Sequence, residues 1–255
     1  MKKGLILCTL IALTVPTFAE TLQDEPTLGV TADVKYLSKW LAKGYPVYDS
    51  QGAVFSTINL DLYQTGFGLI VTHRNATSSG YVDKQRFDYR PYYKSIFFED
   101  KAYATKYNIS AGYEHYYGLA RHKANTTWEW VFDFSWPDLI PGGLVPRYTT
   151  HYEYPVSGGD INRYVSGWVH RFGLGYDLNT SILPKPLHLS SELAYNDGMG
   201  ALTHDWTHAT FGISTGLDIA ESLTLTPALY YQISMDDAIN PSDELYTIIG
   251  LRYTF

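Results

Sequence analysis

Apolar and polar residues alternate along most of the chain from residue 28 onward. The clearest run is WEWVFDFSW at positions 128–136, where Trp and Phe occupy every second position and Glu, Val, Asp and Ser stand between them. A period of two places successive side chains on opposite faces of a β-strand. Each run therefore predicts a strand with one apolar face and one more polar face.

About twelve such runs, many of them about ten residues long, follow one another along the chain. They begin near residues 28, 53, 67, 86, 102, 128, 144, 164, 187, 209, 223 and 246. Turn-rich segments such as PDLIPGG, PVSGGD and NDGMG separate them. No stretch after residue 20 is long and apolar enough for a membrane-spanning helix, and no long stripe of period 3.6 occurs. The sequence predicts an all-β fold.

Two all-β architectures fit alternating strands, a secreted β-sandwich and a transmembrane β-barrel. The polar faces here carry mainly Ser, Thr, Asn, Gly and Tyr with scattered charge, whereas the outer faces of soluble sandwiches are usually rich in lysine. Aromatic residues make up 16% of the chain, with 23 tyrosines, and they gather near strand ends as interfacial girdles do. We therefore predict a single antiparallel transmembrane β-barrel of about twelve strands.

The N-terminal segment MKKGLILCTLIALTVPTFAE has two lysines, an apolar stretch and a small-residue cleavage site. This order is typical of a secretory signal peptide. We predict a signal peptide at 1–19 and an outer-membrane barrel at 20–255. Cleavage would remove Cys8, the only cysteine, so we expect no disulfide and no thiolate metal ligand. A net charge of −7 with no basic run argues against nucleic acid as a partner.

Several stretches resemble a known family. SKWLAKGYPVYDSQGAVFSTINL at 38–60 is similar to the first-hairpin region of the TorF-type family of small Gram-negative outer-membrane porins, in which Ser-x-aromatic-x-x-Arg-Gly is frequent. Ser38, Trp40 and Gly44 match that motif, while Lys43 stands where arginine is usual. ELAYNDG, LTLTPALYY and the last strand resemble the final third of these proteins. The resemblance implies an outer-membrane barrel.

In a barrel, the polar strand faces point into the lumen, where unpaired charges need water or partners. Two hypotheses remain open: a water-filled pore whose charges select solutes, or a closed barrel whose charges pair. We favour the pore. The candidate selectivity residues are Arg86, Asp88, Arg90, Lys94, Lys106, Glu114, Glu129, Asp133, Arg147, Glu153, Arg171, Glu192 and Arg252.

We expect the barrel in the Gram-negative outer membrane with both termini periplasmic, which makes the segment near 42–52 an outward-facing loop. Its expected partners are outer-membrane lipids, periplasmic chaperones, the barrel-assembly machinery and small hydrophilic solutes. Phe255, the last residue, resembles the C-terminal signal that this machinery reads. The last strand is expected to pair with the strand that begins near Leu28.

The leading functional hypothesis is passive diffusion of small hydrophilic solutes. A non-conducting structural or adhesive barrel is one alternative, and an outer-membrane hydrolase is another. HLSSE places His188 and Ser190 on one strand face, a spacing that resembles the active-site strand of outer-membrane phospholipase. THDWTH places His204, Asp205 and His208 near the rim, as in omptin-type proteases. Both motifs fit a polar lumen or loop better, so we expect no catalytic residue, no metal and no cofactor.

Overall fold

The computed structural model describes residues 27–48, 51–78, 85–116, 126–156, 166–202 and 204–255. The predicted signal peptide at 1–19 lies outside the described residues. The described residues contain no helix that is long and apolar enough to cross a membrane.

The described part of the chain consists almost wholly of strands, joined by turns and one 3-10 helix, η1 (Met199–Ala201). The strands are β1 (Gly29–Leu37), β2 (Leu41–Ala42), β3 (Tyr45–Pro46), β4 (Ala53–Asp61), β5 (Phe67–Ala76), β6 (Gln85–Phe97), β7 (Thr105–Tyr116), β8 (Thr127–Ser135), β9 (Val145–Pro155), β10 (Gly167–Leu178), β11 (Leu187–Asp197), β12 (Asp205–Ser214), β13 (Leu217–Ala220), β14 (Leu223–Ser234) and β15 (Glu244–Thr254).

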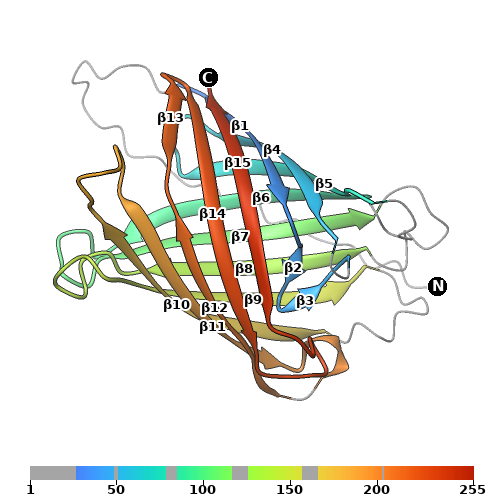
Figure 1. Cartoon of the computed structure of the whole chain (residues 1–255). Helices are drawn as coiled ribbons and strands as arrows, with labels where there is room; N and C mark the ends of the chain where they lie inside the picture. Colours follow the sequence, from blue (N-terminus) through green and yellow to red (C-terminus); the bar gives the residue numbers. More distant parts are fainter. Residues whose placement is uncertain (1–26, 49–50, 79–84, 117–125, 157–165, 203) are drawn as a thin grey trace, which may run out of the picture.

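Twelve of these strands form a closed antiparallel barrel (Figure 1). Each pairs with its neighbours in the order β1-β4-β5-β6-β7-β8-β9-β10-β11-β12-β14-β15, and β15 returns to β1. The short β13 follows β12 and pairs with the same neighbour, β14. The prediction of an all-β, single antiparallel barrel of about twelve strands is confirmed.

Closure occurs between the first and the last strand of the barrel. Seven residue pairs join β1 to β15, from Thr31 opposite Thr254 to Leu37 opposite Ile248, and we call this junction the seam. The pairing continues one residue further, because the backbone N–H of Phe255 donates to the carbonyl of Val30 at 3.1 Å. The expected pairing of the two terminal strands is confirmed, and it leaves neither strand with an open edge.

The outer face of the barrel is apolar and uncovered. Ile58, Phe211 and Ile249 lie on three different strands, and each keeps about half of its side chain exposed, at 53%, 49% and 50%. A soluble sandwich would bury such residues between two sheets. Here they form part of the belt that contacts lipid in a transmembrane barrel.

Part of the segment near 42–52, which was expected to be a loop on the cell-exterior side, folds into the barrel. Residues 41–46 form the separate two-stranded sheet β2–β3. A cluster of buried apolar side chains, including Trp40 and Tyr48, packs this segment against Leu37 and Ala53 of the wall. The sequence did not predict this inward fold, in which Trp40 and Tyr48 bury their rings against the wall. That this end of the barrel faces the cell exterior stays a prediction.

An arginine on the lipid face tests the orientation of the strands. We expect Ile249→Arg to reduce the free energy of unfolding by about 2–4 kcal/mol, because the charge would enter the apolar belt. Thr226→Arg is the matched control: Thr226 lies on β14, one position before Pro227, the residue opposite Ile249, and it shares the inward face with its own partner Gly250. Denaturant unfolding in lipid vesicles measures both, and an equal loss in the two variants would contradict the assigned faces.

Candidate functional site: the lumen and its inward hairpin

The hairpin at residues 38–48 begins where β1 ends. The hydroxyl of Ser38 accepts the backbone N–H of Thr247 at 2.8 Å, and the N–H of Ser38 donates to the carbonyl of Thr247 at 2.9 Å. These two bonds extend the seam by one residue and fix the point at which the chain turns inward.

The tip of the hairpin is a two-residue turn. Leu41 pairs with Pro46 and Ala42 with Tyr45, which leaves Lys43 and Gly44 between the strands. Both have positive φ, 54° and 93°, as a type I′ turn requires. Gly44 is also needed for space, because a methyl group there would lie 2.7 Å from Nδ1 of His208.

The hairpin spans the lumen from its root on β1 and β4. On one side, the ammonium of Lys43 pairs with Glu129 of β8 at 2.8 Å and with Glu153 of β9. On the other side, the side-chain amide of Gln232 on β14 donates to the carbonyl of Gly44 at 3.2 Å. Because the hairpin contacts both sides of the barrel wall, it constricts the lumen. We call the end of the barrel that contains the hairpin the loop end.

Trp40 anchors the root of the hairpin. Its side chain is only 3% exposed, and its ring meets the edges of Tyr48 and Phe55, both at 5.2 Å between centroids. The guanidinium groups of Arg74 and Arg86 lie 5.1 and 5.2 Å from the ring centroid. Aromatic packing and cation–π attraction therefore hold the segment against the wall.

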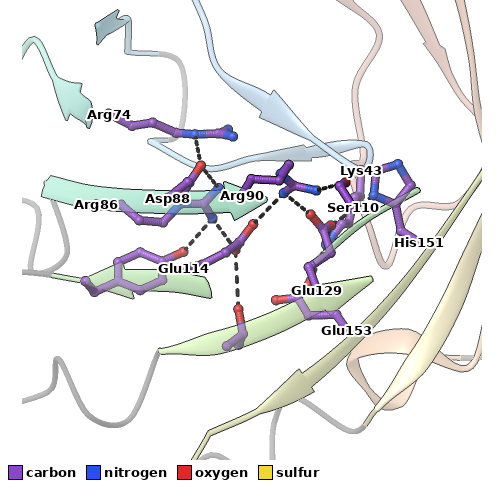
Figure 2. A network of polar contacts seen from close by, with 12 residues as sticks. Lys43, Arg74, Arg86, Asp88, Arg90, Ser110, Glu114, Glu129, His151 and Glu153 are labelled. Atoms are coloured by element: carbon purple, nitrogen blue, oxygen red, sulfur yellow. Dashed lines mark hydrogen bonds and ion pairs between the residues drawn. The ribbon is translucent and has the colours of Figure 1, made fainter. Parts of the chain in front are cut away.

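A buried ionic network lies beside the hairpin (Figure 2). Asp88 bridges two arginines, Arg74 at 2.6 Å and Arg86 at 2.7 Å, and Glu114 accepts from Arg86 at 2.6 Å. Arg90 pairs with Glu129 at 2.5 Å. The carboxylates of Asp88, Glu114 and Glu129 belong to residues that are only 2–4% exposed, so their charges depend on these partners.

Lys43 completes the network from the hairpin. Burial acts to lower its pKa, yet Glu129 and Glu153 outweigh burial and raise the pKa above its ordinary value. Lys43 is therefore an ammonium at neutral pH. Glu129 is shared among Lys43, Arg90 and His151, whose Nδ1 lies 2.9 Å from the carboxylate.

Two cavities occupy the lumen. One, of about 630 Å³, lies beneath the hairpin and is lined by Lys43, Arg86, Arg90, Glu114, Glu129, Arg171 and Glu192 among others. The second, of about 910 Å³, lies toward the opposite, terminal end and is lined by Lys94, Lys106 and Asp133. Arg147 and Thr149 line both cavities, so these two residues lie between them.

The remaining candidate residues lie at the edges of this lumen. Lys94 pairs with Asp61 near the terminal end, and Glu153 meets Lys43 at the loop end. Arg252 lies 3.4 Å from Asp33 on the neighbouring strand and lines neither cavity. Phe255, 77% exposed, packs its ring edge against Tyr253 at the end of the seam.

The residues proposed for a hydrolase do not assemble into a catalytic group. His188 and Ser190 both line the cavity, but His188 pairs with Asp177 at 2.6 Å, and the structure records no hydrogen bond between His188 and Ser190. His204 pairs with Asp197, while His208 is buried beside Thr207. Among the described residues, no group of three or more His, Cys, Asp or Glu could hold a metal ion.

Sequence reasoning missed Lys43, Arg74 and His151 as parts of this network. Alternation would have placed Arg74 inward, since it follows Ile70 and Thr72 on β5, while Leu69 and Val71 take the opposite face. His151 was already on the inward face of β9. Lys43 carried no such signal, because nothing in the local pattern shows that a loop folds into a barrel.

No protein-family model and no curated protein sequence matches this chain. Solved structures of outer-membrane porins and channels do match. The chain is similar to the KdgM porin (TM-score 0.53, 9% identity, covering 88% of this chain and 99% of that one). It is also similar to the NanC porin, with a TM-score of 0.52 and 12% identity over 87% of this chain and 98% of that one. A third match is the COG4313 outer membrane channel from Pseudomonas putida F1, with a TM-score of 0.55 and 10% identity over 93% of this chain and 100% of that one. At these identities the likeness establishes the fold, that of an outer-membrane porin barrel.

Removing the shared carboxylate tests the network. We expect Glu129→Gln to lower the free energy of unfolding by about 3–5 kcal/mol, because Lys43 and Arg90 would stay buried without their common partner. Glu99→Gln, in an exposed turn, is the control and should change stability little. Denaturant unfolding of the refolded proteins gives both values, and a loss below 1 kcal/mol for Glu129→Gln would contradict the pairing.

Adding a methyl group at Gly44 tests whether the hairpin tip packs closely against His208 in the lumen. Gly44 and Gly142 have the same φ of 93°, but a methyl group at Gly142 would meet nothing within 4 Å. We expect Gly142→Ala to cost only the backbone strain of about 1–2 kcal/mol, and Gly44→Ala to displace the hairpin as well. The displacement is measured by the rate of maleimide labelling of Ala42→Cys, combined with either Gly44→Ala or Gly142→Ala. We expect faster labelling with Gly44→Ala, and equal rates in the two double variants would contradict the displacement.

Proposed function

We propose that this protein is a porin-like channel through which small hydrophilic solutes diffuse passively across a Gram-negative outer membrane. The observation that carries the proposal is a polar lumen inside a barrel with an apolar outer face. This lumen holds two cavities, of about 630 and 910 Å³, with Arg147 and Thr149 between them. Charged groups along such a passage replace part of the hydration of a passing solute. The lumen candidates that line these two cavities are the proposed selectivity set, which leaves out Asp88, Glu153 and Arg252.

The hairpin at residues 38–48 would set the size limit of this channel. It crosses the lumen at the loop end and contacts β8, β9 and β14. A barrel of about twelve strands has a narrow lumen, so one inserted hairpin leaves room for small solutes only.

The orientation and the partners form part of the same proposal. Both termini would lie in the periplasm, which places the hairpin on the cell-surface side. Outer-membrane lipids would surround the apolar belt, and periplasmic chaperones would deliver the chain to the barrel-assembly machinery, which would read Phe255. Ser38, Trp40 and Gly44 support a place among TorF-type porins, since all three residues build the hairpin.

Conductance of the refolded protein in planar lipid bilayers tests the proposal. We expect discrete single-channel current steps in KCl. Folded barrels, recognised by a heat-modifiable shift in gel mobility, that give no current would refute the channel and favour a closed structural barrel.

Shortening the hairpin tests the constriction. We expect replacement of residues 41–46 by a short Gly-Ser link to raise single-channel conductance at least about twofold, because one obstacle to ion flow leaves the lumen. The control replaces residues 99–102, in the turn between β6 and β7 at the opposite end of the barrel, with the same link. Equal conductance in both variants would show that the hairpin does not limit flow.

A further inference from the structure

The lumen cations near the hairpin have close carboxylate partners, whereas Lys106 and Arg147, toward the terminal end, have none among the described residues. Near the hairpin, the four cations Lys43, Arg74, Arg86 and Arg90 each have a carboxylate partner within 2.8 Å. The basic residues of β6 are all neutralised in this way, because Lys94 also pairs with Asp61. Attraction for a mobile anion must come from elsewhere.

Lys106 and Arg147 lack a carboxylate partner. Neither side chain makes an ion pair or hydrogen bond with any residue that the structure describes, although both line the larger cavity. Arg171, on the next strand, reaches Glu192 only at 3.8 Å, and its buried Nε has no hydrogen-bond partner. We call Lys106, Arg147 and Arg171 the cationic ledge.

The barrel register places the ledge on three nearby strands. Lys106 of β7 lies opposite Ser135 of β8, and Ser135 lies opposite Arg147 of β9. Adjacent strands are about 4.8 Å apart, so the backbones of Lys106 and Arg147 are separated by roughly 10 Å. Arg171 lies one step toward the loop end, opposite Thr149. The ledge therefore follows the path between the two cavities.

The acidic groups that face the ledge are already engaged. Asp133 accepts a hydrogen bond from Thr149 at 2.6 Å. Glu192 lies between Arg171 at 3.8 Å and His208 at 4.0 Å. Asp177 is paired with His188, and Asp61 with Lys94. A hydroxyl does not neutralise a carboxylate, so Asp133 and Glu192 balance two of the three ledge cations, and the ledge retains one positive charge.

The wall beside Arg147 is bare. Gly173 lies directly opposite Arg147, and Gly175 is the next inward-facing position of β10. A methyl group at Gly175 would lie 3.9 Å from Nε of Arg147 and 3.4 Å from Cε1 of His188. The two glycines leave space next to a free guanidinium, while the hydroxyls of Thr149 and Ser190 line the same cavity.

We propose that the cationic ledge is a transit site for solutes that carry a carboxylate or phosphate group, and that it makes the channel anion-selective. This inference rests on the proposed conduction. A guanidinium binds either group through two parallel hydrogen bonds, and Lys106 offers the next point charge along the path. Several weak sites in a hydrated passage let an anion enter and leave, as conduction requires.

Reversal potentials in a KCl gradient across a planar bilayer test the ledge. We expect the wild type to prefer chloride to potassium. Arg147→Gln should lower the chloride-to-potassium permeability ratio about two- to fivefold, the effect of losing one charge about 4 Å from the ion path in water. Lys106→Gln should act in the same direction, and Arg147→Lys should keep the wild-type ratio.

The matched control is Arg252→Gln, which removes the same charge from a residue that lines neither cavity. Its partner Asp33 keeps Lys35 at 3.4 Å. We expect this variant to retain the wild-type ratio. Citrate added to one side should block wild-type current, and Arg147→Gln should relieve the block.

The outcomes separate the two proposals. A folded wild type without current would overturn the channel itself. If the wild type conducts but Arg147→Gln and Lys106→Gln leave the chloride-to-potassium permeability ratio unchanged, only the proposal of the ledge is overturned. The same holds if Arg147→Gln and Arg252→Gln shift this ratio equally.

Discussion

The pairing of β1 with β15 is the constraint on which the rest of the structure depends. A strand in a bilayer has no water to satisfy its backbone, so a sheet that spans the membrane must have no open edge. Seven residue pairs and the bond from Phe255 to Val30 supply this closure. Once the sheet is closed, each strand has one face toward lipid and one toward the lumen. Alternation along the chain then decides which side chain goes where.

Closure also determines what the interior must do with its charges. Asp88, Glu114 and Glu129 are buried, and a buried carboxylate without a partner is costly. The barrel meets this cost at the loop end by placing each of them beside arginines from neighbouring strands. Toward the terminal end, Lys106 and Arg147 face larger open space, where water can solvate them. Most of the buried ion pairs therefore lie at the loop end, while Lys106 and Arg147 line the cavity toward the terminal end.

The hairpin at residues 38–48 takes part in both the closure of the barrel and the pairing of its buried charges. Ser38 extends the seam, Trp40 packs between the wall and two arginines, and Lys43 supplies the cation that Glu129 and Glu153 share. Gly44 permits both the turn and the close approach of His208. A short motif thus links closure of the barrel, neutralisation of the network and narrowing of the lumen.

The sequence by itself determined the number of barrel strands, their approximate positions and the face of each side chain, because a period of two is a local property of the backbone. It also placed all thirteen candidate charges on inward-facing strand positions, and it indicated the pairing of the last strand with the first. For the same reason, alternation was sufficient to turn Arg74 and His151 inward, even though neither was singled out.

Only the tertiary structure decided which charges are paired. Arg90 meets Glu129 from 39 residues away, and Lys43 meets Glu153 from 110, so the partners depend on how the strands stagger around the barrel. The inward fold of residues 38–48 was also beyond the sequence, because Trp40 and Lys43 find their contacts on strands that are distant in the chain. Local patterns fix which face a residue takes, but long-range register fixes its neighbours. The strand register therefore decides that Arg86 has carboxylate partners while the side chain of Arg147 has none among the described residues.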